Sequence, residues 1–230
     1  MTTIPMVEVK QVHKDYRLGD VVVPVLRDIS FQIDPGEFVA IVGPSGNGKT
    51  TLLNMISGID QPTQGQVFIN QQLLNRMSED ALAAWRGANL GIVFQFFQLL
   101  PALNLLQNVI LPMDFAKTLP PKQRKERAMS LLERVGLADQ AHKLPAAVSG
   151  GQQQRAAIAR ALANDPPLVV ADEPTGNLDT QTSGEVFELF AQLAKQGKTL
   201  IMVTHDLELA GQAGRVLEVV NGQIARDGWA

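Results

Sequence analysis

One stretch in the first quarter of the chain restricts the fold more than any other, because its residue spacing is that of a phosphate-binding loop. Residues 40–51 read AIVGPSGNGKTT, which contains the spacing G-x-x-x-x-G-K-[ST] at Gly43, Gly48, Lys49 and Thr50. Glycines allow successive backbone N–H groups to point at an anion. A helix that begins at this loop adds the positive end of its dipole. The stretch therefore predicts a site for nucleotide phosphates.

The surroundings of this loop favour the phosphate interpretation over a glycine-rich turn that only caps a helix. The run EFVAIV at 37–42 is typical of a short buried strand, and 49–57 are expected to form a helix that ends at Gly58. Lys49 would then reach the β- and γ-phosphates, and the Thr50 hydroxyl would bind Mg²⁺. The expected nucleotide contacts of the loop are Gly43, Pro44, Ser45, Gly46, Asn47, Gly48, Lys49, Thr50 and Thr51.

Composition narrows the classes of protein to which the chain can belong. Its 230 residues and 25.0 kDa are enough for a sizeable core, and its net charge of −3 argues against a nucleic-acid binder with a generally basic surface. No cysteine is present, so disulfides and thiolate metal sites are absent. We find no apolar run long enough to cross a bilayer and no resemblance to a secretory signal. We therefore expect a cytoplasmic protein that reaches a membrane only through a partner.

The order of the apolar patterns predicts an α/β fold with an interruption. Residues 1–75 and 166–230 are typical of an α/β core that includes an N-terminal antiparallel β subdomain, whereas 76–165 are typical of a helical insertion. The charge run at 122–127 is expected to be a solvated helix face rather than a nucleic-acid patch. The other expected elements are strands at 29–33, 67–70, 168–171 and 199–204, helices at 78–87, 122–136 and 180–195, and a hairpin with a type I′ turn at Asn221-Gly222.

Two carboxylates directly follow a strand that is expected to be buried. Asp172 and Glu173 lie near the end of the segment LVVADEP at 168–174. Ligands of open α/β sheets bind beyond the carboxyl ends of the strands. There Asp172 would hold Mg²⁺ together with Thr50, and Glu173 would orient or deprotonate an attacking water. The structural alternative is that the two acids only cap a turn before Pro174. The phosphate loop in the same chain makes this alternative less favoured.

Gln95 and His205 are two further candidates for the site, and both have a structural alternative. His205 comes after the strand 199–204, where a hydrogen-bond donor would stabilise charge on the γ-phosphate and position the water. A lone histidine is more often structural. Gln95 ends the run GIVFQ, and its amide could reach the metal or the water. A buried amide satisfied by the backbone fits the spacing equally well.

A second glycine-rich helix start is present at VSGGQQQR, residues 148–155. Ser149, Gly150 and Gly151 offer a hydroxyl and backbone N–H groups, so they predict another anion site. Two such sites in one chain suggest a nucleotide held between two subunits, although capped helices with early glycines are common. Tyr16 could stack on an adenine ring, with ordinary packing as the favoured alternative.

Taken together, these motifs resemble the ATPase subunits of ABC transporters over essentially the whole chain. GPSGNGKT resembles the Walker A loop, and LVVADEP resembles the Walker B strand with its aspartate and the catalytic glutamate. Val148 and Asn47 depart from the family pattern, which usually has Leu before the signature serine and often has Ser in the loop. The resemblance further identifies Gln95 as the Q-loop glutamine, Ser149, Gly150, Gly151 and Gln152 as the signature motif, Asp179 as the D-loop aspartate, His205 as the switch histidine and Tyr16 as the A-loop aromatic.

The resemblance implies a P-loop NTPase core of the ABC type that binds ATP and Mg²⁺ and works as a head-to-tail dimer. ATP on 43–50 of one copy would be closed over by 149–151 of the other, and hydrolysis would reopen the pair. This motion would drive an integral-membrane permease, a separate chain, from the cytoplasmic face of the inner membrane. The permease would dock in a groove near Gln95. The apolar residues expected to divide between core and docking surface are Phe96, Phe97, Leu99 and Leu100.

Within this family the chain is similar to the branch of macrolide exporters, the lipoprotein-release ATPase and the FtsE-type division ATPase, on the stretches 19–30, 93–113 and 174–179. This branch implies export or extraction of a substrate from the membrane, with a periplasmic adaptor reached through the permease. The alternative is an FtsE-like ATPase that moves a membrane partner without transport. A soluble ATPase of DNA repair or translation is disfavoured because the chain has one cassette and no heptad extension. A non-hydrolysing sensor is disfavoured because Glu173 and His205 are present.

Overall fold

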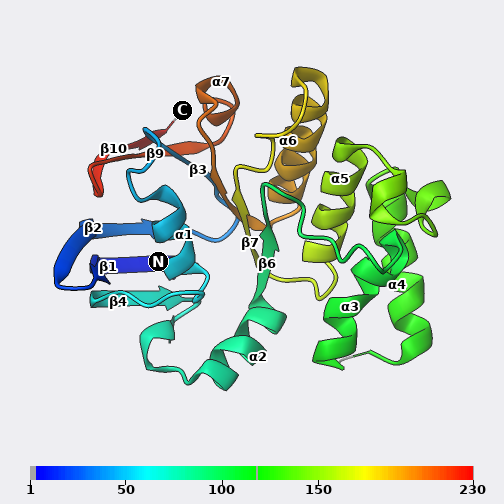
Figure 1. Cartoon of the computed structure of the whole chain (residues 1–230), viewed down its shortest axis with the longest axis horizontal. Coiled ribbons are helices and arrows are strands. Elements are labelled where there is room, and N and C mark those ends of the chain that lie inside the picture. The colour runs from blue at the N-terminus through cyan, green and yellow to red at the C-terminus, as the bar shows by residue number, and fades with distance from the viewer. Residues whose placement is uncertain (1–3, 118, 230) are drawn as a thin grey trace.

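A six-stranded sheet forms the centre of the molecule in the computed structural model, which describes residues 4–117 and 119–229 (Figure 1). In spatial order its strands are β10 (Gln223–Trp229), β9 (Arg215–Val220), β3 (Phe38–Val42), β8 (Thr199–Val203), β7 (Leu168–Asp172) and β6 (Leu90–Val93). All neighbouring pairs are parallel except β10 and β9. Every residue of β3 and β8 is buried, as expected for parallel strands that are covered on both faces.

A second sheet of four antiparallel strands lies beside the first, at the end of the molecule that contains the N-terminal segment (Figure 1). Its strands, in spatial order, are β2 (Val21–Ile33), β1 (Val7–Leu18), β4 (Gln64–Ile69) and β5 (Gln72–Leu73). Helix α1 (Lys49–Ile56) contacts strands of both sheets and buries Leu52, Met55 and Ile56 in the same apolar cluster as β1, β2 and β3. This packing fixes the helix that follows the phosphate loop relative to both sheets.

The remaining helices lie along the central sheet and at the end of the molecule opposite the four-stranded sheet (Figure 1). Helices α3, α4 and α5 contact one another, and α5 also contacts α6. Asn104 and Ser149 begin α3 and α5, each with a capping box that closes on a glutamine three residues later. The helices are α2 (Glu79–Asn89), α3 (Leu105–Ala116), α4 (Pro121–Arg134), α5 (Gly150–Ala161), α6 (Thr180–Lys195) and α7 (Leu207–Ala210), with 3₁₀ turns at Leu74–Arg76, Ala138–Gln140 and Pro145–Ala147.

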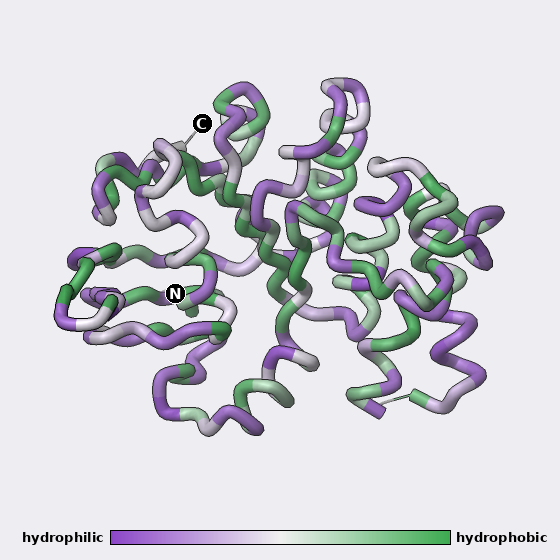
Figure 2. Tube along the Cα trace, in the orientation of Figure 1, coloured by the Kyte–Doolittle hydropathy of each residue, from purple (hydrophilic) through white to green (hydrophobic). Residues whose placement is uncertain are grey.

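Apolar residues are concentrated along the central strands, and polar residues predominate on the outer helix turns (Figure 2). One buried cluster continues from the central sheet through α6 and α5 into α3 and α4, so the helical part and the sheet share a core. Phe190 of α6 is the largest fully buried side chain in this cluster. Within the described ranges, no helix has both the length and the apolar character that crossing a membrane requires.

The observed elements confirm the predicted α/β fold with an antiparallel β subdomain and helices between its core strands. Helix α6 has the predicted bounds and the predicted cap, because the Asp179 side chain accepts a hydrogen bond from the Thr182 N–H. Two details differ from expectation. Helix α2 continues through Gly87, and β6 lies inside 76–165, where it pairs in parallel with β7 and belongs to the core sheet. The helical insertion therefore contains one core strand, while its outer boundaries stay a prediction.

Candidate functional site

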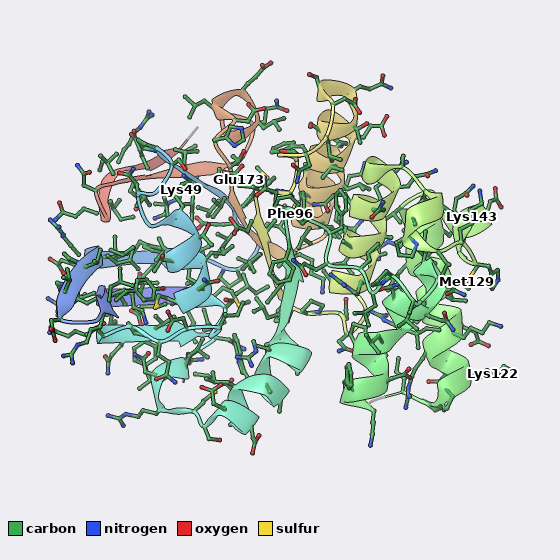
Figure 3. All side chains as sticks on the ribbon, viewed as in Figure 1. Lys49, Phe96, Lys122, Met129, Lys143 and Glu173 are labelled. Atoms are coloured by element: carbon green, nitrogen blue, oxygen red, sulfur yellow. The ribbon has the colours of Figure 1, made fainter. Side chains whose placement is uncertain are left out.

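Four segments that bear motif residues leave the central sheet at the same edge. Strands β3, β6, β7 and β8 are parallel, so their carboxyl ends lie together, and the loop 43–48, Gln95, Glu173 and His205 follow them. Lys49 and Glu173 both line the pocket at this edge, and Figure 3 labels them in this part of the molecule. A pocket of about 440 Å³ opens here and is lined by Val25, Ser45, Gly46, Gly48, Lys49, Thr50, Thr51, Gln95, Glu173 and His205.

The phosphate loop has a backbone that only glycine can adopt at its first position. Gly43 has φ +140°, and a Cβ there would lie 2.0 Å from the Val219 carbonyl oxygen of β9. The Lys49 ammonium donates to the carbonyl oxygens of Gly43 and Pro44, at 2.8 and 3.0 Å. The loop is thus folded back around the lysine at the N-terminal end of α1, which suits it to bind a polyphosphate.

Asn47, one of the two departures from the family pattern, holds the loop rather than lining the pocket. Its side-chain oxygen accepts a 2.6 Å hydrogen bond from the Asn221 N–H, and its amide donates to the Ser45 carbonyl at 3.1 Å. Asn221 and Gly222 have φ values of +50° and +75°, as expected for the predicted type I′ turn. The Gly222 carbonyl accepts a bond from the Arg27 N–H of β2, so this turn connects the phosphate loop to the other sheet.

Asp172 and Thr50 form a pair of oxygen ligands that fits a magnesium ion. The Thr50 hydroxyl donates to Asp172 Oδ1 at 3.2 Å. No group of three or more His, Cys, Asp or Glu side chains in the described part of the chain could hold a metal ion. Mg²⁺ commonly takes only one or two protein oxygens and completes its shell with phosphate oxygens and water, so the donors that are present fit this ion beside bound nucleotide.

Burial raises the pKa of Asp172, and the neighbouring Glu173 charge raises it further, while Thr50 and Lys49 act in the opposite direction. The ionised carboxylate is therefore less stable in the folded protein than in the unfolded chain. Such a group lowers stability above its folded pKa and has no such effect below its unfolded pKa. The ionised Asp172 carboxylate thus lowers the stability of the protein without ligand, as a carboxylate suited to a cation would.

Replacing this carboxylate should stabilise the protein without nucleotide. We expect Asp172→Asn to raise the melting temperature at neutral pH by up to a few degrees, because solvent screens this partly buried group and limits the gain to about 1 kcal/mol or less, and about 1 kcal/mol corresponds to about 2–4 °C in a chain of this size. The gain should disappear as the pH falls below the ordinary aspartate pKa of about 3.9. Differential scanning fluorimetry over this pH range measures it, with the exposed Asp139→Asn as the matched control. An unchanged melting temperature at neutral pH would contradict the expectation.

Glu173 has a strained backbone that turns its carboxylate towards His205. Its φ is +47°, which costs a residue with a Cβ about 1–2 kcal/mol, and its N–H donates to the Val203 carbonyl at 2.9 Å. The carboxylate oxygen Oε2 accepts from the His205 ring Nδ1 at 2.7 Å and from the His205 N–H at 3.4 Å. The glutamate side chain is 17% exposed and the histidine 70% exposed. An oriented carboxylate at the mouth of the pocket is suited to accept a proton from water.

Gln95 lies within the pocket and is half-buried, so it is not the fully buried amide of the structural alternative. A Cβ added to Gly176 would lie 2.9 Å from Gln95 Nε2, which places this amide against the segment after β7. The Asn177 side-chain amide donates to the Gln95 carbonyl at 3.1 Å. The residue therefore sits between β6 and the segment that carries Glu173.

The second anion-type helix start lies outside this pocket in the same chain. The Ser149 hydroxyl accepts from the Gln152 N–H at 3.3 Å, and the Gln152 side-chain oxygen accepts from the Ser149 N–H at 2.9 Å. A Cβ on Gly151 would lie 2.3 Å from Thr182 Cγ2, so this glycine permits the close packing of α5 on α6. None of 149–152 lines the pocket. Within one chain, this helix start is therefore separate from the pocket that Lys49 and Glu173 line.

Asp179 and Tyr16 also lie outside the pocket lining. Asp179 accepts from the Thr182 N–H and hydroxyl, and the hydroxyl bond is the main cause that lowers the pKa of this carboxyl. The Tyr16 hydroxyl donates to Asp60 Oδ2 at 2.9 Å, and the Lys14 ammonium lies 4.8 Å from the ring centroid. Burial and the Asp60 carboxylate raise the pKa of Tyr16. Tyr16 pairs with Val23, two residues before the pocket residue Val25.

Two site neighbours were missed by sequence reasoning, Gln154 and Arg160 of α5, whose bonds reach the segment around Gln95. The sequence signal that could have identified Gln154 was its position in the predicted helical pattern. It shares a helix face with Ala157, Ile158 and Ala161, so it is a polar residue on an apolar stripe.

Comparisons with known proteins identify the same family as the resemblance of the motifs. A family model described as ABC transporter matches residues 26–176. The lipoprotein-releasing system ATP-binding protein LolD of Anaeromyxobacter dehalogenans is 47% identical over 225 residues, which are 97% of this chain and 94% of that protein. The macrolide export ATP-binding/permease protein MacB of Sodalis glossinidius is 44% identical over 225 residues, which are 98% of this chain and 34% of that protein.

A solved structure with the same fold is the dimeric, post-hydrolysis state of the ATP-binding cassette MJ0796 bound to ADP and Pi. It is 40% identical in sequence, covers 97% of this chain and 98% of its own, and superposes with a TM-score of 0.91. The likeness extends over both sheets and the helical part, and therefore over all the elements that bear the motifs.

Proposed function

Because this chain belongs to the ABC transporter family and is an ABC-type ATPase, we propose that two copies close head to tail around ATP and drive a separate membrane permease. The observation that carries the proposal is the meeting of the phosphate loop, Asp172 and the Glu173–His205 pair at one edge of the sheet, with the 149–151 helix start outside that pocket. One copy thus has a complete set of groups for hydrolysis, but its second anion site needs another copy.

The chemistry of the site follows from the positions of its own side chains. Lys49 and the loop N–H groups bind the negative charge of the β- and γ-phosphates. Glu173 accepts the proton of the attacking water, and His205 holds the carboxylate in place through its ring N–H and its backbone N–H. Thr50, Asp172 and Gln95 would hold Mg²⁺, which when bound neutralises phosphate charge.

The permease would dock in an apolar groove beside this site. The groove has a volume of about 1010 Å³ and lies between α2, α3 and β6, with Gln98 and Arg160 also in its lining. Phe115 lines it and is 78% exposed. Of the apolar residues after Gln95, Phe96 and Leu100 are exposed and Leu99 packs on the core, and none of these three lines the groove.

The relatives suggest what kind of machine this would be. LolD is named for a lipoprotein-releasing system, and MacB for macrolide export with its permease in the same chain. By analogy, this protein would sit at the cytoplasmic face of the inner membrane, bound to a permease encoded separately. It would power export or extraction of a substrate from the membrane, and a periplasmic adaptor would be reached only through the permease.

The head-to-tail arrangement is tested by a charge placed at the start of α5. Asp is as good an N-cap as Ser, so Ser149→Asp keeps the helix start but brings a negative charge towards the phosphates of the other copy. We expect ATP-dependent dimerisation, followed by light scattering in a Glu173→Gln background, to need at least about tenfold more ATP, since like charges in contact cost several kcal/mol. Ser149→Asn, an uncharged cap, is the matched control.

Mixing two defective proteins separates a site shared between copies from a site within one copy. Ser149→Asp and Lys49→Ala proteins are each expected to dimerise poorly, but a mixed dimer has one site with neither change. Dimers should therefore form in the mixture at ATP concentrations at which neither protein dimerises alone. No gain on mixing would contradict the head-to-tail arrangement.

A further inference from the structure

Helix α5 carries two polar side chains, Gln154 and Arg160, that form hydrogen bonds to backbone carbonyls of the segment 94–98, which lies between β6 and α3. This segment contains Gln95 and crosses from the core sheet to the helices. The start of the same helix is the proposed anion site for the other copy. Contacts that join α5 to 94–98 therefore connect groups at two different nucleotides of the proposed dimer.

The backbone of 94–98 is strained, and only two hydrogen bonds of the described residues lie within it, from the Phe97 N–H to the Phe94 carbonyl and from the Gln98 N–H to the Phe96 carbonyl. Phe97 and Gln98 are consecutive left-handed residues, with φ values of +59° and +53°. Each is unfavourable for a residue with a Cβ. Two in succession persist only where other contacts fix them. The turn also places the carbonyl oxygens of both residues towards α5, where Arg160 meets them.

Arg160 supplies the contact that fixes this turn. Its guanidinium donates to the Phe97 carbonyl at 2.9 Å and also to the Gln98 carbonyl. It forms no ion pair with a carboxylate of the described residues. A planar fork with several donors can serve two neighbouring carbonyls at once, whereas a lysine ammonium is a single point on a flexible stem. The Arg160 guanidinium therefore donates to the Phe97 and Gln98 backbone carbonyls of this segment rather than to a carboxylate.

Gln154 fixes the other end of the segment. It is fully buried, and its Nε2 donates to the Pro174 carbonyl at 2.7 Å and to the Phe94 carbonyl at 3.4 Å. Phe94 precedes Gln95, and Pro174 follows Glu173. Its Oε1 is buried and has no hydrogen-bond partner among the described residues, which opposes folding. We interpret this amide as a residue whose role is the pair of hydrogen bonds that its Nε2 makes to the Phe94 and Pro174 carbonyls.

We propose that Gln154 and Arg160 are positioning residues that tie 94–98 to α5, so that Gln95 and the start of α5 move as one body. Contact of Gln95 with the nucleotide of its own copy then helps to bring Ser149 to the nucleotide of the other copy. The inference rests on the proposed head-to-tail dimer. It goes beyond that proposal because it names the side chains that connect segment 94–98 to α5.

The experiment compares variants in the Glu173→Gln background by the ATP concentration that gives half-maximal dimerisation in light scattering. Arg160→Lys keeps the charge but loses the fork, and Gln154→Met keeps the volume but loses the bridge. Each variant is made with and without Gln95→Ala. The matched control is Arg134→Lys, because Arg134 is an exposed arginine of α4 that donates to the Gln196 side chain.

We expect Gln95→Ala, Arg160→Lys and Gln154→Met each to raise the half-maximal ATP concentration about fivefold or more, the usual size of coupling between sites. The Arg160 and Gln154 effects should vanish once Gln95 is alanine, because the contact that they transmit is then absent. ATP affinity measured on the monomer at low protein concentration should stay unchanged in Arg160→Lys. Thermal unfolding identifies any variant that loses its fold, and Arg134→Lys should match the parent.

Three results would overturn the coupling. In one, Arg160→Lys and Gln154→Met leave dimerisation unchanged while Gln95→Ala impairs it. In another, they impair it equally with and without Gln95, which would show that they act elsewhere. In the third, Gln95→Ala itself has no effect. Failure of the parent Glu173→Gln protein to dimerise with ATP would instead overturn the proposed function.

Discussion

Glu173→Gln should leave ATP bound but slow its hydrolysis by about 10²–10⁴-fold, the usual contribution of a positioned general base. Glutamine keeps the size of the side chain and an oxygen that can accept from His205, so the geometry around the 2.7 Å contact is retained. It cannot accept a proton from water at neutral pH. Phosphate release under saturating ATP measures the rate, and equilibrium binding of ATP measures the retained affinity.

The matched control is Glu188→Gln on α6, an exposed glutamate that bears no relation to the pocket. It should hydrolyse ATP at the parental rate. Hydrolysis by Glu173→Gln at that same rate would show that another group takes the proton. The strained φ of Glu173 would then need an explanation other than catalysis.

Lys49→Ala should weaken ATP binding by about 2 kcal/mol or more, which is about thirtyfold or more in Kd. Lys49 is only 8% exposed, and the backbone oxygens of Gly43 and Pro44 hold its ammonium inside the loop. Among the described residues that line the pocket, Lys49 is the one lysine or arginine, so the change removes their fixed positive charge. Titration calorimetry with ATP measures the change.

Lys122→Ala is the control for loss of a positive charge. Lys122 lies on α4, far from Lys49 (Figure 3), and its side chain is 90% exposed. It should bind ATP as the parent does, and both variants should unfold at similar temperatures. Equal ATP affinity of the Lys49→Ala variant and the parent would contradict the phosphate-binding role of the loop.

The sequence is sufficient to predict the elements whose signals are local. Helix α6 has its cap at Asp179 and its apolar face within one run of residues, and the type I′ turn needs only Asn221 and Gly222. Strand β6 has no such signal. Among the described strands, its four residues pair only with β7, which lies far along the chain, so tertiary pairing decides its structure.

The candidate site divides in the same way. Spacing in the sequence identifies the residues of each motif, and strand order explains why Thr50, Asp172, Glu173 and His205 lie together. The sequence does not identify hydrogen-bond partners that are brought together only by folding, such as the Asn221 N–H that donates to the Asn47 side chain. Arg160 is a further case. Its partners are backbone carbonyls, which every residue has, so no residue type in the sequence indicates them.

The attachment of the phosphate loop to the β9–β10 turn has a consequence for the way the protein is made. Asn47 bonds to Asn221, 174 positions later in the chain, and Gly43 packs against the Val219 carbonyl. A ribosome adds residues in sequence order, so a nascent chain that ends before β9 lacks the support of its own ATP loop. We therefore expect stalled chains of that length to bind ATP poorly, and the motor to become competent only late in its synthesis.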